Sequence, residues 1–176
     1  MKNTLKAAMC GVLSALSVLL LFFGGASFLF AYIMPMVTGL IMIMLKRACG
    51  TPWAVTAFVS VSFLSFMLVA DRECVLMYIL FFGYYPILHP SIEKISSKLI
   101  RWAAKLLVFN IMITVVQLIL VYIFGIPFLE EGTGTIFIPV FAVLMNVMFV
   151  VYDMLINRLT LLYKLRLEKK IKKYFK

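Results

Sequence analysis

The chain has 176 residues, of which 65% are hydrophobic, and its mean hydropathy is +1.11. A soluble domain is about 45 to 50% apolar, and a chain of this length has too much surface to bury two-thirds of its residues. Its composition therefore excludes a water-soluble globular protein. The net charge of +10 does not indicate nucleic-acid binding, because the basic residues lie between apolar runs and form no separate basic domain.

Six apolar runs approach the ~20 residues that a helix needs to cross a bilayer. They cover residues 7–23, 28–45, 53–70, 74–88, 104–124 and 136–157. We therefore predict an all-α polytopic integral membrane protein whose six transmembrane helices form one domain over residues 1–158.

The positions of the basic residues predict the orientation of these helices. If the N-terminus is cytoplasmic, every lysine and arginine except Arg72 lies on the cytoplasmic side, as the positive-inside rule requires. We therefore expect a multi-pass protein of the cell (plasma) membrane with both termini in the cytoplasm. A cleaved signal peptide is the alternative for the first run, and its removal would leave the other five orientations unchanged.

The stretch FFGYYPILHP at residues 81–90 ends the fourth run, and charge follows it directly. Beyond it, apolar residues recur at spacings of three and four beside a basic stripe of Lys94, Lys98, Arg101 and Lys105. This pattern predicts an interfacial amphipathic helix at about residues 90–103, with His89 as an interfacial residue and not a proton relay. Residues 159–176 are predicted to form a basic amphipathic cytoplasmic tail that lies on anionic lipid or docks a partner.

Polar side chains within the runs need partners, because an unpaired polar group in hydrocarbon is costly. Tyr85, Asn110 and Asp153 lie at similar predicted depths, which favours a structural polar cluster at the cytoplasmic ends of runs four to six. A local contact of Asp153 with Asn157 and Arg158 is the alternative.

The outer half carries aromatic and amide side chains that suit a flat, weakly polar small molecule. The candidate ligand-binding residues are Tyr78, Gln117, Tyr122, Phe137, Phe141 and Asn146. Ordinary interfacial aromatics and helix-bridging amides are the alternative. The outer loops contain four acids and one arginine, a balance that favours a cationic ligand.

Small residues recur every four positions on the first run, at Ala7, Gly11 and Ala15. This spacing lets two membrane helices approach closely, so the stripe predicts contact with a helix of a partner or of this chain. The three cysteines have neither paired nor metal-ligand spacing, and with a single histidine they predict no disulfide, metal or cofactor.

The span count, the orientation and the stripe of Ala7, Gly11 and Ala15 resemble the substrate-capture S components of energy-coupling factor transporters. The resemblance implies that the stripe contacts a transmembrane coupling subunit, that ligand is held in the outer half, and that cytoplasmic ATPases drive transport. FFGYYPILHPSIEK is also similar to a group of uncharacterised small bacterial membrane proteins with an FFGYYP motif, in which lysine is expected at position 89.

The leading functional expectation is a substrate-binding membrane subunit for uptake of a vitamin-like small molecule. The chain has no phosphate-binding glycine-rich loop, so partner subunits would supply the energy. The alternative is a membrane scaffold of a cell-envelope complex, similar to the rod-shape-determining membrane protein. An enzyme is not expected, because the runs contain no clustered acids and no serine and histidine arrangement.

Overall fold

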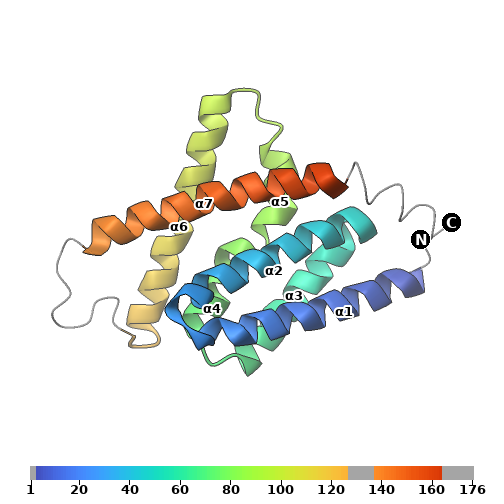
Figure 1. Ribbon diagram of the computed structural model, residues 1–176, viewed down its shortest axis with the longest axis horizontal. Coiled ribbons are helices and arrows are strands. Elements are labelled where there is room, and N and C mark those ends of the chain that lie inside the picture. The colour runs from blue at the N-terminus through green and yellow to red at the C-terminus, as the bar shows by residue number, and fades with distance from the viewer. Residues whose placement is uncertain (1–2, 127–136, 164–176) are drawn as a thin grey trace.

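The computed structural model describes residues 3–126 and 137–163 of the chain (Figure 1). These residues form helices joined by short turns and contain no strand. In chain order the elements are α1 (Asn3–Phe22), the 3₁₀ turn η1 (Phe23–Ala26), α2 (Phe28–Cys49), α3 (Thr51–Leu68), α4 (Arg72–Met77), the π turn η2 (Tyr78–Phe82), α5 (Tyr85–Ile92), α6 (Lys98–Tyr122) and α7 (Phe137–Leu162).

Six helical segments are long and apolar enough to cross a membrane, and each overlaps one predicted run. They are Asn3–Ala26, Leu29–Cys49, Thr51–Leu68, Arg72–Ile92, Lys98–Tyr122 and Ile138–Leu162. The predicted all-α polytopic fold is therefore confirmed. We call the end of each span that the charge pattern predicts to be cytoplasmic the inner end, and the opposite end the outer end.

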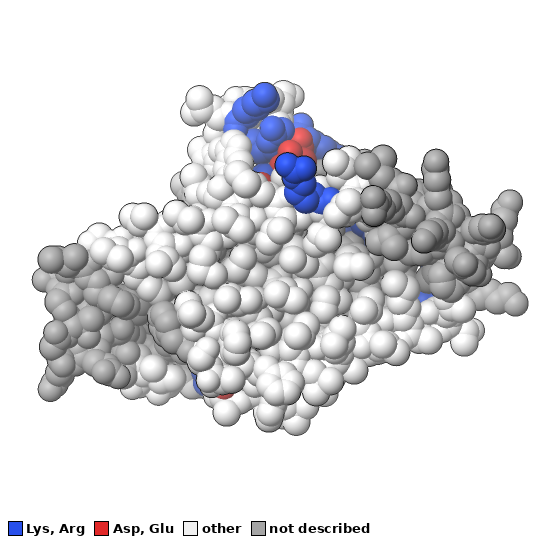
Figure 2. Space-filling view, viewed as in Figure 1, with Lys and Arg blue, Asp and Glu red and all other residues white. Residues whose placement is uncertain are grey.

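The surface of the described helices is largely apolar, as contact with lipid requires. Val12, Phe63 and Val143 are examples of large side chains that point outward from three different helices. In Figure 2 the charged side chains gather over the turn between α5 and α6. Most of the other described residues on this face are uncharged and are drawn in white.

The first three helices pack closely through small residues. The buried residues of α1 are Cys10, Ser14, Ser17 and Leu21, and those of α3 are Ala54, Ala57, Val61 and Ser65. Small side chains at these spacings allow two backbones to approach closely, where dispersion contacts replace the hydrophobic drive that is missing in lipid. The opposite face of α1 is left exposed, and it includes Ala7, Gly11 and Ala15.

The fourth span, made of α4, η2 and α5, lies at the centre of the bundle and is the most buried of the six. The Phe81 ring of this span stacks on Tyr85 and packs edge to face with Phe109 and Phe149. Within the span, the Gly83 N–H donates to the Tyr78 carbonyl at 2.8 Å, which closes a π turn one residue wider than an α-helical turn. Aromatic packing therefore anchors this span to both α6 and α7.

The last two helices cross each other steeply in Figure 1, with α6 passing behind α7. Near their crossing, the Phe109 and Phe149 rings stack with centroids 4.5 Å apart. Next to this stack, Asn110 and Asn146 exchange two side-chain hydrogen bonds of 2.9 and 3.1 Å. The direct contact between α6 and α7 is therefore local, and other interactions must hold the remainder of these helices in place.

The chain between residues 90 and 103 does not form the separate interfacial helix that the pattern predicts. Instead, α5 ends at Ile92, the chain turns, and α6 begins at Lys98 and continues as the fifth span. The turn is held by Arg101, whose guanidinium donates to the carbonyls of Glu93 and Ile95 at 3.3 and 3.2 Å. The predicted tail is described only as far as residue 163, and the rest of it lies outside the described residues.

Replacing Gly39 by alanine should destabilise the protein. A Cβ at Gly39 would overlap the Tyr152 hydroxyl and the Phe82 carbonyl oxygen, and the carbonyl belongs to a backbone that cannot easily move. We expect a loss of about 1 to 3 kcal/mol, the usual cost of overpacking, seen as a lower melting temperature in detergent. Gly11→Ala is the matched control, because no heavy atom lies within 4 Å of its added Cβ. Equal melting temperatures for the two variants would contradict the close packing at Gly39.

Candidate functional site

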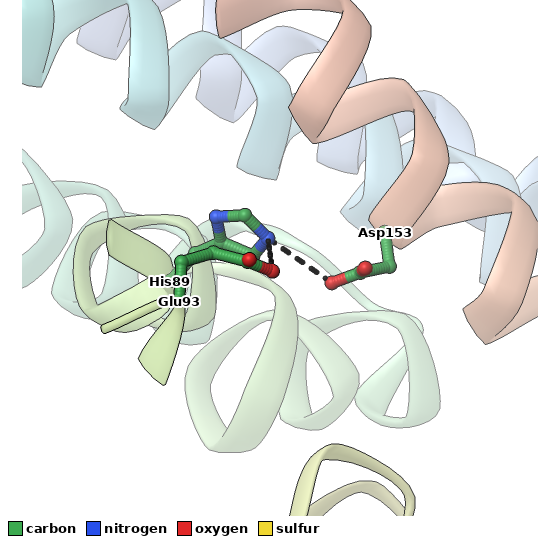
Figure 3. A group of neighbouring side chains, drawn as sticks. All are labelled: His89, Glu93 and Asp153. Carbon is green, nitrogen blue, oxygen red and sulfur yellow. Dashed lines mark ion pairs between the residues drawn. The ribbon is translucent and has the colours of Figure 1, made fainter. Parts of the chain in front are cut away.

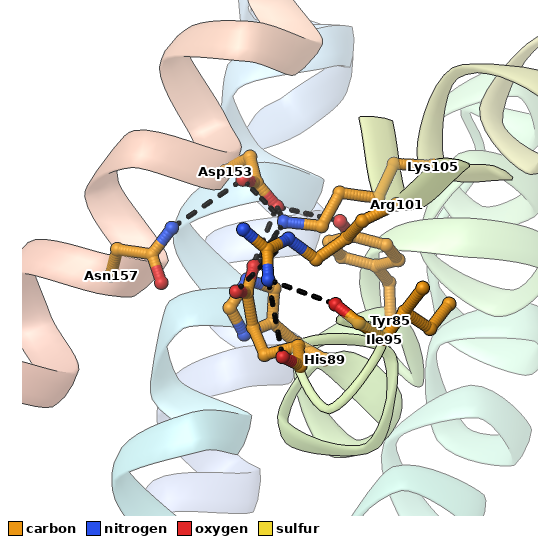
Figure 4. Close-up of polar contacts among 8 residues, drawn as sticks. Tyr85, His89, Ile95, Arg101, Lys105, Asp153 and Asn157 are labelled. Atoms are coloured by element: carbon orange, nitrogen blue, oxygen red, sulfur yellow. Dashed lines mark hydrogen bonds and ion pairs between the residues drawn. The ribbon is translucent and has the colours of Figure 1, made fainter. Parts of the chain in front are cut away.

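A buried group of charged and polar side chains joins three spans at their inner ends (Figure 4). We call it the inner ionic cluster, and its members are Tyr85, His89, Glu93, Arg101, Lys105, Asp153 and Asn157. Its centre is the Asp153 carboxylate on α7, which is only 1% exposed. A carboxylate at this position requires partners, because an unpaired charge in a low-dielectric interior is very costly.

Lys105 is the principal partner of Asp153. Its Nζ lies 2.8 Å from Asp153 Oδ2 and 2.9 Å from Oδ1, and its side chain is 2% exposed. The same ammonium group contacts Glu93 Oε1 and lies 5.2 Å from the centre of the Trp102 ring. The expectation that Lys105 belongs to a stripe facing the lipid headgroups is therefore wrong, because the lysine points into the bundle and bridges α6 to α7.

Tyr85 and His89, both on α5, bind the same carboxylate oxygen. The Tyr85 hydroxyl donates to Asp153 Oδ1 at 2.6 Å, and His89 Nε2 lies 3.2 Å from that oxygen. With a hydrogen on Nε2, the His89 imidazole can donate to Asp153. His89 is 3% exposed, which corrects its interpretation as an interfacial residue. The structure brings Tyr85 and Asp153 together as predicted, whereas Asn110 instead pairs with Asn146.

His89, Glu93 and Asp153 present one ligand atom each in an arrangement that could hold a metal ion (Figure 3). Lys105 Nζ, however, contacts both carboxylates and lies 3.5 Å from His89 Nε2. A metal ion would have to displace this ammonium group, which already supplies the positive charge. We therefore assign the cluster no metal, and interpret it as an ionic clamp between α5, α6 and α7.

The charges of the inner ionic cluster balance one another. Arg101 Nε lies 3.4 Å from Glu93 Oε2, so two basic and two acidic side chains form a connected network around the His89 imidazole. A balanced network costs less in a low-dielectric region than any one of its charges alone. One feature of the sequence could have revealed this network. Its polar residues occur in pairs four positions apart, which places both members on one helical face: His89 and Glu93, Arg101 and Lys105, and Asp153 and Asn157.

A second polar group lies near the outer end of the bundle and contains two predicted ligand residues. Tyr32 Oη and Gln117 Nε2 both donate to Glu73 Oε1, at 2.6 and 3.1 Å. The Tyr32 ring also meets the edge of Phe141, with centroids 5.9 Å apart. We call Tyr32, Glu73, Gln117 and Phe141 the outer carboxylate site. Sequence reasoning included Gln117 and Phe141, but it missed Tyr32 and treated Glu73 as a loop charge.

Three of the other four candidate ligand residues do not join this site. Tyr78 is fully buried against Phe58, and its hydroxyl has no hydrogen-bond partner within the described part of the chain. Tyr122 is 81% exposed, and Asn146 is paired with Asn110. The side chain of Phe137 lies outside the described residues. The six predicted residues therefore do not line one common cavity.

Two surface grooves of the described structure are lined by apolar side chains alone. One, of about 300 Å³, lies between α2 and α7 and includes Met36, Leu40, Val147 and Val151. The other, of about 410 Å³, lies on α1 and is lined by Leu5, Ala8, Met9, Val12 and Leu13. Neither includes a residue of the outer carboxylate site, and both are suited to lipid chains or to an apolar helix.

Comparisons of the chain with protein-family models, with curated proteins and with solved structures found no match. The function of the two candidate sites must therefore be inferred from the contacts and burial of their own residues. The inner ionic cluster is saturated with internal partners, whereas the outer carboxylate site is only partly buried at Glu73. Of the two, the outer site has the chemistry that could receive a ligand.

Breaking the pair of Lys105 and Asp153 should destabilise the bundle, and removing both charges should restore part of the loss. We expect Lys105→Met and Asp153→Leu each to lower the free energy of unfolding in mixed micelles by about 3 to 5 kcal/mol, because each leaves a buried charge without its partner. The double variant should lose less than the sum of the two. Asn157→Ala is the control, since its amide lies 3.4 Å from Asp153 and is exposed. Strictly additive losses would show that the two charges do not stabilise each other.

Proposed function

We propose that the protein is the substrate-binding membrane subunit of an uptake system for a small organic cation, with energy supplied by partner subunits. The observation that carries this proposal is the Glu73 carboxylate in the outer half of the bundle. It is held by two neutral donors, stands beside aromatic rings, and forms no ion pair within the described residues.

The two donors leave part of Glu73 available. Both Tyr32 and Gln117 are directed at Oε1, and the side chain is only partly buried, so Oε2 can accept a hydrogen bond from a ligand. Neither donor carries a positive charge that would pair with the carboxylate. An ammonium group is the ligand chemistry that complements it best.

Arg72 does not neutralise this charge, although it precedes Glu73 in the sequence. Its guanidinium donates to the Phe66 carbonyl at 2.6 Å and lies over the rings of Phe66 and Phe124, at 5.2 and 5.9 Å. Asp71 accepts a hydrogen bond from the Cys74 N–H and caps α4. Neither Arg72 nor Asp71 is therefore paired with Glu73, and a carboxylate that forms no ion pair within the described residues supports a cationic ligand.

The aromatic side chains of the outer carboxylate site favour an organic cation over a hydrated metal ion. Tyr32 and Phe141 pack edge to face beside Glu73, and cations are attracted to the faces of such rings. Oxygen ligands for Ca²⁺ or Mg²⁺ would have to number six or more. A single carboxylate with a phenol and an amide suits one ammonium group.

The exposed stripe on α1 supports the dependence on a partner. Ala7, Gly11 and Ala15 point away from α2 and α3, and a side chain at Gly11 would meet open space. Small residues on an exposed helical face are suited to close contact with another membrane helix. We propose that a transmembrane coupling subunit, itself joined to ATPases, binds here.

A scaffold of a cell-envelope complex is the second candidate. It is favoured by the same exposed stripe and by the apolar grooves, which offer contacts to protein helices without any solute. Copurification separates the two candidates, because a transporter subunit should retain ATPases and a scaffold should retain wall-synthesis proteins. Native mass spectrometry of the gently purified protein should in addition reveal a bound small molecule if the transporter proposal is correct.

Neutralising Glu73 should abolish recognition of a cationic ligand with little effect on the fold. In Glu73→Gln the side chain keeps its shape and one acceptor oxygen but loses its charge, so affinity for organic ammonium compounds should fall by a factor of about 10 or more, as removal of a charged hydrogen bond implies. Ligand-induced shifts in melting temperature, measured across a panel of ammonium compounds, would report this loss.

Asp71→Asn is the control for this experiment, because asparagine preserves the helix cap and removes a neighbouring charge. Equal responses of the wild-type chain and Glu73→Gln to every ammonium compound would contradict a role for Glu73.

A bulky residue at Gly11 should prevent partner binding while the chain remains folded. Gly11→Leu adds a side chain where no atom lies within 4 Å, so the melting temperature of the isolated protein should not fall. Copurification of the partner should be lost, because leucine keeps two helices apart. Val59→Leu, at an exposed position on α3, is the control. Retention of every partner by Gly11→Leu would place the contact elsewhere.

A further inference from the structure

We propose that Met9, Cys10 and Cys49 form a binding site for a soft monovalent metal ion, with Cu(I) as the expected occupant. The site lies at the inner ends of α1 and α2, and it is separate from both the outer carboxylate site and the inner ionic cluster. It does not depend on the proposed transport function.

The three sulfur atoms meet through Cys49. Its Sγ lies 4.0 Å from Met9 Sδ, and its thiol is close enough to that of Cys10, the residue after Met9, for the two to interact electrostatically. Two sulfur ligands bound to one first-row metal ion at about 2.3 Å each are separated by roughly 4 Å or slightly more. The separation of Cys49 and Met9 therefore permits both atoms to bind one ion with little movement.

The backbone explains why Cys49 takes this position. It is the last residue of α2, and Gly50 alone separates it from α3, with φ of 102° in the region that favours glycine. This tight turn brings Cys49 against α1, where Cys10 also contacts the Trp53 carbonyl with its Sγ at 3.7 Å. Because the sulfurs come from two helices 40 residues apart in the sequence, no spacing motif reveals them.

The donor set selects the class of metal. Thiolate and thioether ligands favour soft ions such as Cu(I), whereas Mg²⁺, Ca²⁺ and Mn²⁺ prefer oxygen. Structural Zn²⁺ sites use four ligands, and the thioether of methionine is not among its usual donors. Two cysteines and one methionine therefore suit Cu(I), which accepts two or three sulfur ligands.

The surroundings can accommodate the charge of the loaded site. Cu(I) binding to two thiols displaces two protons and leaves one net negative charge, with no change in oxidation state. The ammonium group of Lys6 interacts with Cys49 and would offset that charge. In the inner ionic cluster Lys105 already occupies the centre, whereas here Cys49 Sγ contacts Met9 Sδ and Cys10 Sγ contacts the Trp53 carbonyl.

The site is shielded but close to one end of its helices. Cys10 is 8% exposed and Cys49 is 5% exposed, so bulky thiol reagents would reach them poorly. Met9 is partly exposed and also lines the groove on α1, which gives a small ion a route past a flexible thioether. A buried sulfur pair of this kind holds a metal ion away from water and oxygen.

Anaerobic titration of the detergent-purified full chain with Cu(I) tests the proposal, with a chromophoric Cu(I) chelator as competitor. We expect one Cu(I) per chain, release of about two protons per ion, and sulfur as the ligand element in X-ray absorption spectra. Cys49→Ser and Cys10→Ser should weaken binding by about 100-fold, and Met9→Leu by about tenfold, the two ends of the range known for lost metal-site contacts. Cys74→Ser is the control, because this third buried thiol contacts Leu21 at the outer end and should leave Cu(I) binding unchanged.

Cu(I) affinity that is equal in the wild-type chain and Cys49→Ser, or that falls equally in Cys74→Ser, would overturn the site. Loss of Cu(I) binding after mild oxidation, with two thiols consumed and recovery on reduction, would support the convergence of Cys10 and Cys49. Melting temperatures of all variants identify any loss that comes from unfolding. If Cys49→Ser unfolds, Cys49→Ala provides the same comparison without a buried hydroxyl.

Discussion

The ion pair between Lys105 and Asp153 is the interaction on which the second half of the bundle depends. In Figure 1 α6 and α7 cross steeply, and the aromatic stack and asparagine pair hold them together near that crossing. Toward the inner ends, Lys105 reaches across to α7, while Tyr85 and His89 attach α5 to the same carboxylate. One carboxylate therefore determines how three spans meet. Its position also explains the buried state of an imidazole and an ammonium group, since each would be unfavourable there without it.

Asp153 and Glu73 differ in how completely their carboxylates are satisfied. Asp153 receives hydrogen bonds on both oxygens and is paired with a lysine, so little of its charge remains for another molecule. Glu73 has two neutral donors on one oxygen, and the arginine beside it in the sequence is bound to Phe66. The first acid stabilises the fold, and the second leaves a charge at the outer end. This difference is the physical basis for proposing a binding function at Glu73.

The sequence predicted the spans well because hydrophobic length and the placement of charges are determined by the bilayer. It also placed Tyr85 and Asp153 at the same depth, where they do form a hydrogen bond. It failed for Asn110, His89 and Lys105, because depth along a helix says nothing about which neighbour a side chain faces. Asn110 points to Asn146 at the helix crossing, and Lys105 points inward although its neighbours form a regular basic stripe. Contacts between helices, such as Tyr32 with Glu73 or Met9 with Cys49, depend on packing that a single sequence does not contain.

The fourth span carries the outer acid on α4 and the inner histidine on α5, and the π turn η2 lies between them. A turn that accommodates an additional residue sets the rotation of one half of a helix independently of the other. Shortening this segment by one residue would turn Glu73 by about 100° around the helix axis while His89 stayed against Asp153. The π turn therefore sets the direction in which Glu73 points relative to α5. A change in this turn would reorient the outer carboxylate without altering the contacts of His89 with Asp153.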